Sequence, residues 1–208
     1  MVDSIIFDLD GTMWDSSDGV TKAWNEAVRE AGYDFTIEKE AIDKIMGLPV
    51  QEVADQIFFM LPAEDRLPLF RKCLDKEMIV LGREGGKLME GLSEVLTELK
   101  KKYRLFIVSN CQDGYVQTFL EAHQMWEYFE DFMCAGDMGL TKGESNKALI
   151  DKYHLQKAVY VGDTQGDENS AREAGIEFIY ARYGFGEVPD YQYGIDCLRE
   201  LPMVLEQM

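Results

Sequence analysis

Short apolar segments that end in small or acidic residues alternate with segments of helical periodicity along the 208-residue chain. The apolar segments predict strands at 5–7, 105–108, 132–135, 159–161 and 176–180, and the periodic segments predict helices at 92–99, from about 113, at 145–153 and at 169–174. Strands that alternate with helices form right-handed βαβ units around a mostly parallel sheet. The pattern therefore predicts an α/β, Rossmann-like fold with helices on both faces of the sheet.

A long helical stretch interrupts this alternation after the first strand. Apolar residues recur at helical spacing over 20–31, 50–61 and 67–81, with breaks at Gly32, Pro49 and Pro62. No apolar strand pattern lies between them. We therefore predict an α/β core made of residues 1–15 and 84–208, with an all-helical insert at 16–83.

The overall charge limits the classes of partner. Lys and Arg number 21 and Asp and Glu number 39, which gives a net charge of −18. Such a field repels nucleic acid and anionic membranes, and it leaves a basic partner or a metal cation open. The four cysteines form no CxxC pair, so no zinc site is indicated. The apolar runs are far shorter than the ~20 residues that a membrane span needs. The first residues also show no basic region ahead of an apolar stretch, so we expect a cytoplasmic protein.

Polar side chains follow three of the predicted strands. Asp8 and Asp10 follow the first, Ser109-Asn110 follow the second, and Gly162-Asp163 follow the strand at 159–161. Since the carboxyl ends of parallel strands meet at one edge of the sheet, these residues are expected to share a crevice. Clustered carboxylates repel one another unless a cation lies among them. Mg²⁺ is the best candidate, because it needs only one or two carboxylates with water and substrate oxygens.

These residues, in this order, resemble the four motifs of the haloacid dehalogenase-like phosphohydrolases. The matching residues are Asp8-Leu9-Asp10-Gly11-Thr12, Ser109-Asn110, Lys142 and Gly162-Asp163-x-x-x-Asp167. The insert at 16–83 resembles the helical cap of this family, so the resemblance covers almost the whole chain. It is similar to the phosphoglycolate phosphatase-like branch, which implies a small organic phosphate or a nucleotide-derived phosphate as substrate.

The resemblance implies a catalytic pair at the first motif. Asp8 would be the nucleophile that forms an aspartyl-phosphate and so divides hydrolysis into two transfers. Asp10 would protonate the leaving oxygen and then activate water. The dehalogenating members of the superfamily lack an acid at the position of Asp10, so phosphoryl chemistry is preferred here. Without the other motifs, Asp8 to Gly11 would indicate only a turn after a strand.

The same resemblance assigns the metal and phosphate ligands. The carboxylates of Asp8 and Asp163 and the backbone carbonyl of Asp10 would hold Mg²⁺, with Asp167 in the outer shell or holding a water. Ser109, Thr12 and the amides of Asn110 and Gly11 would bind the phosphate, and Lys142 would supply positive charge. A second interpretation of Asp163 and Asp167 is helix capping, which is compatible with a role in the site.

Several positions leave alternatives open. Lys142 is expected on the loop before a helix, but Lys147 lies close enough to compete, and Gly143 stands where the family usually has proline. The turn at 89–91 likewise departs from the family's aromatic-proline-glycine. By resemblance the segment Met46 to Pro49 would face the substrate. Arg182 either approaches the site or lies on the surface.

Two other functions fit the same motifs. A phosphomutase would return the phosphoryl group to its substrate instead of releasing it. A phospho-acceptor signalling module would keep the acyl-phosphate without turnover, although a cap would serve no purpose in such a module. We therefore expect a Mg²⁺-dependent phosphatase of a small phosphorylated metabolite, with these two as alternatives.

Overall fold

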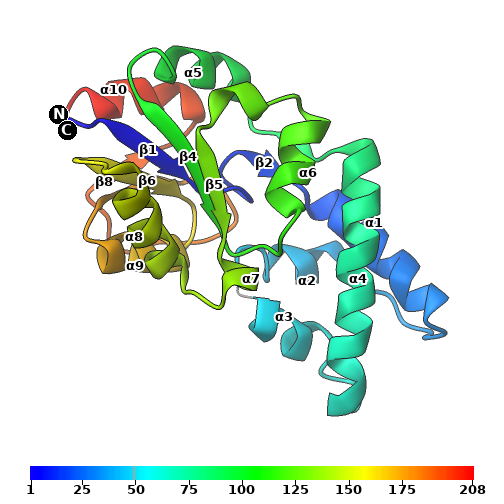
Figure 1. The fold of residues 1–208 in the computed structure, drawn as a ribbon. Coiled ribbons are helices and arrows are strands. Elements are labelled where there is room, and N and C mark those ends of the chain that lie inside the picture. Colours follow the sequence, from blue (N-terminus) through cyan, green and yellow to red (C-terminus); the bar gives the residue numbers. More distant parts are fainter. Residues whose placement is uncertain (49) are drawn as a thin grey trace.

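The computed structural model describes residues 1–48 and 50–208, and its centre is a six-stranded parallel sheet (Figure 1). The strands lie in the order β5-β4-β1-β6-β7-β8. Their bounds are β1 (Ser4–Phe7), β4 (Arg104–Ser109), β5 (Asp131–Cys134), β6 (Ala158–Gly162), β7 (Glu177–Ala181) and β8 (Tyr193–Ile195). The predicted parallel α/β sheet is confirmed. The edge strand β8 was not predicted, because three residues that include Gly194 carry too little apolar signal.

Strand β1 lies at the middle of the sheet, between β4 and β6. Ile6 pairs with Phe106 on one side and with Tyr160 on the other. All four residues of β1 are buried, since helices cover both faces of the sheet, and such strands have continuous apolar sequences. The chain runs outward from β1 to β4 and β5, then returns to the other side of β1 at β6. This change of direction opens a crevice at the carboxyl end of β1.

Helices cover both faces of the sheet (Figure 1). On one face lie α5 (Leu92–Leu99) and α10 (Leu201–Leu205), and on the other lie α8 (Lys142–Tyr153) and α9 (Gln165–Ala174). A hydrophobic core lies on each face of the sheet, and alternate residues of β1 point into one or the other. Ile5 and Phe7 pack in the core beneath α5 and α10, and Ile6 packs in the core beneath α8 and α9. The remaining core helices are α6 (Tyr115–Ala122), α7 (Ala135–Met138), η1 (Trp126–Tyr128) and η2 (Leu198–Glu200).

The segment between β2 (Trp14–Asp15) and β3 (Lys87–Leu88) contains four helices among its described residues, and they lie to one side of the sheet in Figure 1. They are α1 (Ser17–Glu30), α2 (Lys39–Asp43), α3 (Val50–Ile57) and α4 (Ala63–Glu84). The helix α2 was not predicted. Helices α1 and α4 pack together, with the rings of Trp24 and Phe70 edge to face at 5.3 Å. Pro49, the last residue of the predicted substrate-facing segment, lies outside the described residues.

The two connections between this helical segment and the sheet run side by side. Strand β2 (Trp14–Asp15) enters the segment, and β3 (Lys87–Leu88) leaves it, and the two form an antiparallel pair. On the core side, α4 also packs against α6. The helical segment is therefore joined to the sheet through a two-stranded ribbon and a helix contact.

Two helices begin earlier than predicted because capping boxes start them. Thr141 and Glu144 form one around the start of α8, and Thr164 and Asp167 form another around the start of α9. Helix α8 was predicted from 145 and α9 from 169. Lys142 is consequently the first residue of α8, and the expectation that it lies on the preceding loop is wrong.

The longest helix is α4, and it is amphipathic. Within residues 1–48 and 50–208, none of the helices combines the length and the apolar character needed to cross a membrane.

Candidate active site

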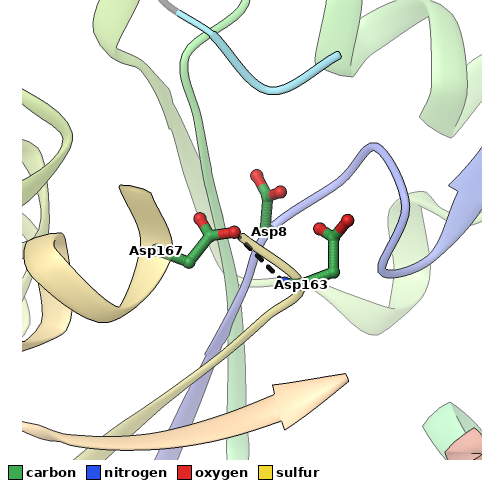
Figure 2. Close-up of side chains that lie close together, drawn as sticks. All are labelled: Asp8, Asp163 and Asp167. Carbon is green, nitrogen blue, oxygen red and sulfur yellow. Dashed lines mark hydrogen bonds between the residues drawn. The ribbon is translucent and has the colours of Figure 1, made fainter. Parts of the chain in front are cut away.

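Three carboxylates from separate elements converge at the carboxyl edge of the sheet, as Figure 2 shows. Asp8 follows β1, Asp163 follows β6, and Asp167 lies in the first turn of α9. One oxygen of each lies within 4.8 Å of the others, and all three residues are buried. They meet because β1 and β6 are hydrogen-bonded neighbours and α9 begins directly after β6. The structure thus brings together all three carboxylates that were assigned to the metal.

Lys142 lies inside this cluster. Its ammonium Nζ is 2.7 Å from Asp8 Oδ1 and 2.5 Å from Asp167 Oδ1, and the side chain is 5% exposed. The ammonium also lies 5.6 Å from the centre of the Tyr160 ring. Lys147 instead lies on the surface, 3.5 Å from Glu173. Between the two candidate lysines, the structure therefore places Lys142 at the carboxylates.

A close approach of α8 to α9 accounts for glycine after this lysine. A Cβ at Gly143 would lie 2.8 Å from the Cβ and 2.3 Å from Oε2 of Glu173. A proline ring there would need still more room. Glycine at 143 lets the two helices pack closely and so lets Lys142 reach Asp167.

Burial and the nearby charge of Asp167 disfavour ionisation of two carboxyl groups of the cluster, Asp8 and Asp163. Burial, followed by the charge of Asp167, raises the pKa of Asp8 well above its usual value, although Lys142 opposes this. The same two causes raise the pKa of Asp163 to about 7. Burial acts to lower the pKa of Lys142, but attraction by Asp167 and Asp8 outweighs it and the net shift is upward. One ammonium among three carboxylates leaves negative charge that a cation would neutralise.

The free oxygens of the cluster fit a hard cation. Oδ2 of Asp8 is buried and has no hydrogen-bond partner among the described residues. Asp167 is more fully occupied: Oδ1 accepts from Lys142, and Oδ2 accepts from the amides of Asp163 and Thr164 and from the Thr164 hydroxyl. Asp8 is thus the better direct ligand, and Asp167 suits the outer shell. Oxygen ligands of this type fit Mg²⁺.

Asp163 is held by groups from two separate parts of the chain, one at residues 11–12 and one at residues 184–185. The Thr12 hydroxyl donates to its Oδ1 at 3.1 Å, and the backbone amide of Phe185 donates to Oδ2 at 2.7 Å. Two glycines, Gly11 and Gly184, pack against it so closely that a Cβ at either would lie 2.2 Å from an Asp163 atom. Thr12, predicted to bind phosphate, therefore contacts the carboxylate cluster through Asp163.

Asp10 does not join the carboxylate cluster with its side chain. Its Oδ1 accepts hydrogen bonds from Trp14 Nε1 at 2.9 Å, Ser16 Oγ at 2.8 Å and Tyr115 Oη at 2.9 Å. Burial raises its pKa, and these three donors act in the opposite direction. The three donors fix the orientation of the carboxyl group, which lines a cavity beside Ser109.

Ser109 and Asn110 lie next to Asp8 because β4 pairs with β1. Ser109 is buried at the end of β4, and the Asn110 side-chain amide donates to the carbonyl of Gly47 at 2.9 Å. This bond links the sheet to the helical segment. The backbone amide of Gly11, expected to be free for phosphate, instead donates to the carbonyl of Trp14 at 2.9 Å. The turn after Asp10 folds back on itself and uses that amide.

A cleft of about 980 Å³ opens between the helical segment and the sheet. Met46, Gly47 and Leu48 line it from one side, and Lys142 and Phe185 line it from the other. Arg182 is paired with Asp196 at 2.7 Å on the surface, which matches the second of its two interpretations.

Sequence reasoning missed the side chains that support the assigned ones. Trp14, Ser16 and Tyr115 all contact Asp10, and Glu77 lines the cavity beside it. Aromatic side chains such as those of Trp14 and Tyr115 are typical of a hydrophobic core. The sequence does not show which group their N–H and O–H donors will bind. The Thr-x-x-Glu and Thr-x-x-Asp signatures, by contrast, were present at 141–144 and 164–167 and indicate both helix starts.

Fold and site together define a Rossmann-like α/β protein with a lysine-bridged carboxylate cluster at the carboxyl edge of its sheet. A family model described as haloacid dehalogenase-like hydrolase matches residues 5–181. The chain belongs to this family. The predicted membership is thereby confirmed, and the chain is a phosphoric monoester hydrolase similar to the phosphoglycolate phosphatases.

Individual relatives agree with this assignment. A probable phosphatase IndB of Dickeya dadantii is 29% identical, over 86% of this chain and 81% of the relative. A phosphoglycolate phosphatase of Nitrosospira multiformis is 25% identical, over 99% and 93% of the two chains. Among solved structures, a haloacid dehalogenase-like hydrolase from Streptococcus pneumoniae superposes with a TM-score of 0.82 at 22% identity, covering 98% of each chain. This last likeness shows the fold.

Proposed function

We propose that this hydrolase is a Mg²⁺-dependent phosphatase that acts on a small phosphorylated metabolite through an aspartyl-phosphate on Asp8. The observation that carries the proposal is the state of the Asp8 carboxylate. Lys142 holds Oδ1 at 2.7 Å, while Oδ2 is buried without a partner among the described residues. A carboxylate oriented through one oxygen and unpartnered at the other is arranged for nucleophilic attack and for binding a cation.

The proposed reaction has two transfers. A carboxylate oxygen of Asp8 attacks phosphorus, and the bond from phosphorus to the alcohol oxygen breaks. Asp10 gives the departing oxygen a proton, then takes a proton from the water that attacks the aspartyl-phosphate. Inorganic phosphate leaves, and both carboxyl groups return to their starting states. The three donors on Asp10 Oδ1 support this role, because they hold the group in one orientation.

Charge on the transferred phosphoryl group is matched by donors already present. Lys142, which lies 2.7 Å from Asp8, would hold the phosphoryl oxygens together with the Ser109 hydroxyl and the backbone amide of Asn110 at the end of β4. Asp8, Asp163 and the Asp10 carbonyl would hold Mg²⁺, with Asp167 outside them, and the bound ion would neutralise charge on those oxygens. The three close carboxylates and the unpartnered oxygen of Asp8 support this assignment.

The helical insert predicted at 16–83 is proposed to act as a cap. Met46 to Leu48 line the cleft, and the bond from Asn110 to Gly47 already joins the insert to the sheet. Closure over the cleft would exclude bulk water while the aspartyl-phosphate forms. The names of the relatives make phosphoglycolate one compound to test as substrate.

Phosphate release from an aryl phosphate, with and without Mg²⁺, tests the proposal. Wild type is expected to release phosphate only with the metal, and Asp8→Asn is expected to lose activity by on the order of 10³-fold or more. Asp151→Asn, on the exposed face of α8, is the matched control and should keep wild-type activity. Equal activity of wild type and Asp8→Asn would sink the proposal. If a hexose phosphate were isomerised without release of free phosphate, the result would favour the phosphomutase. An acyl-phosphate that persists for many minutes would favour the phospho-acceptor module.

A further inference from the structure

A second, smaller cavity adjoins the site on the side of Asp10. It has a volume of about 70 Å³ and lies between the helical segment and the sheet. A single water needs roughly 10–15 Å³ on this measure, so the cavity has room for about five to seven groups of that size. Asp10 and Ser109 line it from the sheet, and Trp24, Phe70 and Glu77 line it from the helical segment. We call this cavity the Glu77 pocket.

The Glu77 pocket is where the alcohol part of a substrate would lie. In the proposed reaction the leaving oxygen must be within hydrogen-bond reach of Asp10. The larger cleft is lined by Lys142 but not by Asp10, whereas the Glu77 pocket is lined by Asp10 and Ser109 together. A phosphoryl group held at Asp8 and Ser109 would therefore direct its alcohol into the Glu77 pocket.

The walls of the pocket are apolar apart from a few groups, and its charged groups are acidic. Asp10 and Glu77 are the carboxyl groups, and no Lys, Arg or His side chain of the described residues lines it. A substrate carboxylate placed there would be buried without a cation and would face Glu77. Burial of an unpaired charge is strongly unfavourable.

Glu77 retains acceptor capacity toward the pocket. Its Oε2 accepts from Trp24 Nε1 at 2.5 Å and its Oε1 from Gln112 Nε2 at 3.1 Å, and the residue is 4% exposed. A carboxylate has about four acceptor positions, so about two remain for a ligand. Burial raises the pKa of Glu77 to about 7, and a bound cation would offset that cost of ionisation.

We propose that the Glu77 pocket selects a short alcohol phosphate whose far end donates hydrogen bonds, an ammonium above all, and that it rejects a far-end carboxylate such as that of phosphoglycolate. This inference rests on the proposed phosphatase function and specifies its substrate class. Glu77 is the residue that sets the preference, since it is the charged group of the pocket that the proposed reaction does not use.

Three phosphates that differ only at the far end of a two-carbon alcohol test the inference. They are phosphoethanolamine, ethyl phosphate and phosphoglycolate, each assayed for kcat/KM with Mg²⁺. Wild type is expected to prefer phosphoethanolamine to phosphoglycolate by at least about tenfold, which corresponds to about 1.4 kcal/mol. Glu77→Gln is expected to reduce this ratio about tenfold. Asp75→Asn, which removes a carboxylate from the exposed face of the same helix, is expected to leave it unchanged.

The ratio between substrates is the readout, so a general loss of activity in Glu77→Gln does not imitate the effect. Equal or better turnover of phosphoglycolate by wild type overturns the inference and leaves the phosphatase intact. An unchanged ratio in Glu77→Gln also overturns the inference and leaves the phosphatase function intact. Activity on an aryl phosphate but on none of the three two-carbon phosphates has the same consequence. If folded wild type releases phosphate from no compound at all, the proposed function fails, and the inference fails with it.

Discussion

The Lys142 ammonium joins two buried carboxylates, Asp8 and Asp167, that repel each other without it. It reaches both from the first residue of α8. Removing one partner of a buried ion pair leaves an uncompensated charge, which is costlier than the pair itself is stabilising. The same ammonium faces the space proposed for the phosphoryl oxygens. A single side chain thus contributes to the stability of the site and to its proposed chemistry.

Lys142→Met is therefore expected to lower the free energy of unfolding by about 3–5 kcal/mol, because two carboxylates lose their buried cation. Activity on the aryl phosphate should fall by on the order of 10²-fold or more. Urea unfolding and phosphate release measure the two effects. Lys147→Met is the control, and its exposed pair with Glu173 should contribute less than about 1 kcal/mol. Similar losses in both variants would show that the position of Lys142 is unimportant.

Among the loops and helices, glycines decide how closely the elements approach the site. Gly143 allows α8 to lie against α9, and Gly184 allows the loop after β7 to lie against Asp163. The Cβ that alanine would add at Gly184 lies 2.2 Å from the Cβ of Asp163, and neither atom can rotate away. The backbone amide of Phe185 in this loop also donates a hydrogen bond to Asp163. The position of the loop and the position of the carboxylate therefore depend on each other.

Gly184→Ala is expected to push the loop and Asp163 apart. Overpacking of this kind costs about 1–3 kcal/mol of stability, which urea unfolding would measure. The rise in Tm produced by Mg²⁺ should also become smaller, because Asp163 is a proposed ligand. In Gly166→Ala, the nearest atom to the new Cβ is 3.4 Å away. That variant should change stability by less than about 1 kcal/mol, and an equal loss in both variants would refute the close-approach explanation.

Across the whole molecule, several buried acids face each other while the surface is strongly acidic. Burial raises the pKa of Asp8, Asp10, Asp163 and Glu77, the last two to about 7. A carboxyl group with a raised pKa binds its proton more tightly in the folded state than in the unfolded state. The free energy of unfolding therefore falls as pH rises from the unfolded pKa to the folded pKa. Without metal, the protein should be more stable near pH 5 than near pH 8.

Glu77→Gln should remove part of this pH dependence, because the amide does not titrate. The pKa of Glu77 rises from 4.5 to about 7 on folding, which corresponds to about 3–4 kcal/mol at roughly 1.4 kcal/mol per unit. The fall in stability between pH 5 and pH 8 should be smaller in the variant by about 2–3 kcal/mol, because the rest of the change lies below pH 5. Metal-free urea unfolding at both pH values measures it. Identical pH slopes in wild type and variant would contradict the assigned burial of a titrating Glu77.

The parallel sheet and the edge at which Asp8, Ser109 and Asp163 meet were predicted from local patterns. Apolar runs of strand length between periodic helices are detectable in any window of sequence, and parallel strands align their carboxyl ends whatever their order. Because Asp8, Ser109 and Asp163 each come at the end of a predicted strand, their meeting at one edge of the sheet could be predicted. Helix starts were misplaced at α8 and α9, although their capping signatures were in the sequence.

The sequence by itself determined the fold class, the family and the edge of the sheet where the acidic residues gather. Only the tertiary structure decided between Lys142 and Lys147, gave Asp10 its three donors, and placed Glu77 beside Asp10. Periodicity and motifs depend on neighbours along the chain, so the sequence carries them directly. Contacts such as Tyr115 to Asp10 depend on side-chain direction and on how distant elements pack, and these exist only once the chain has folded.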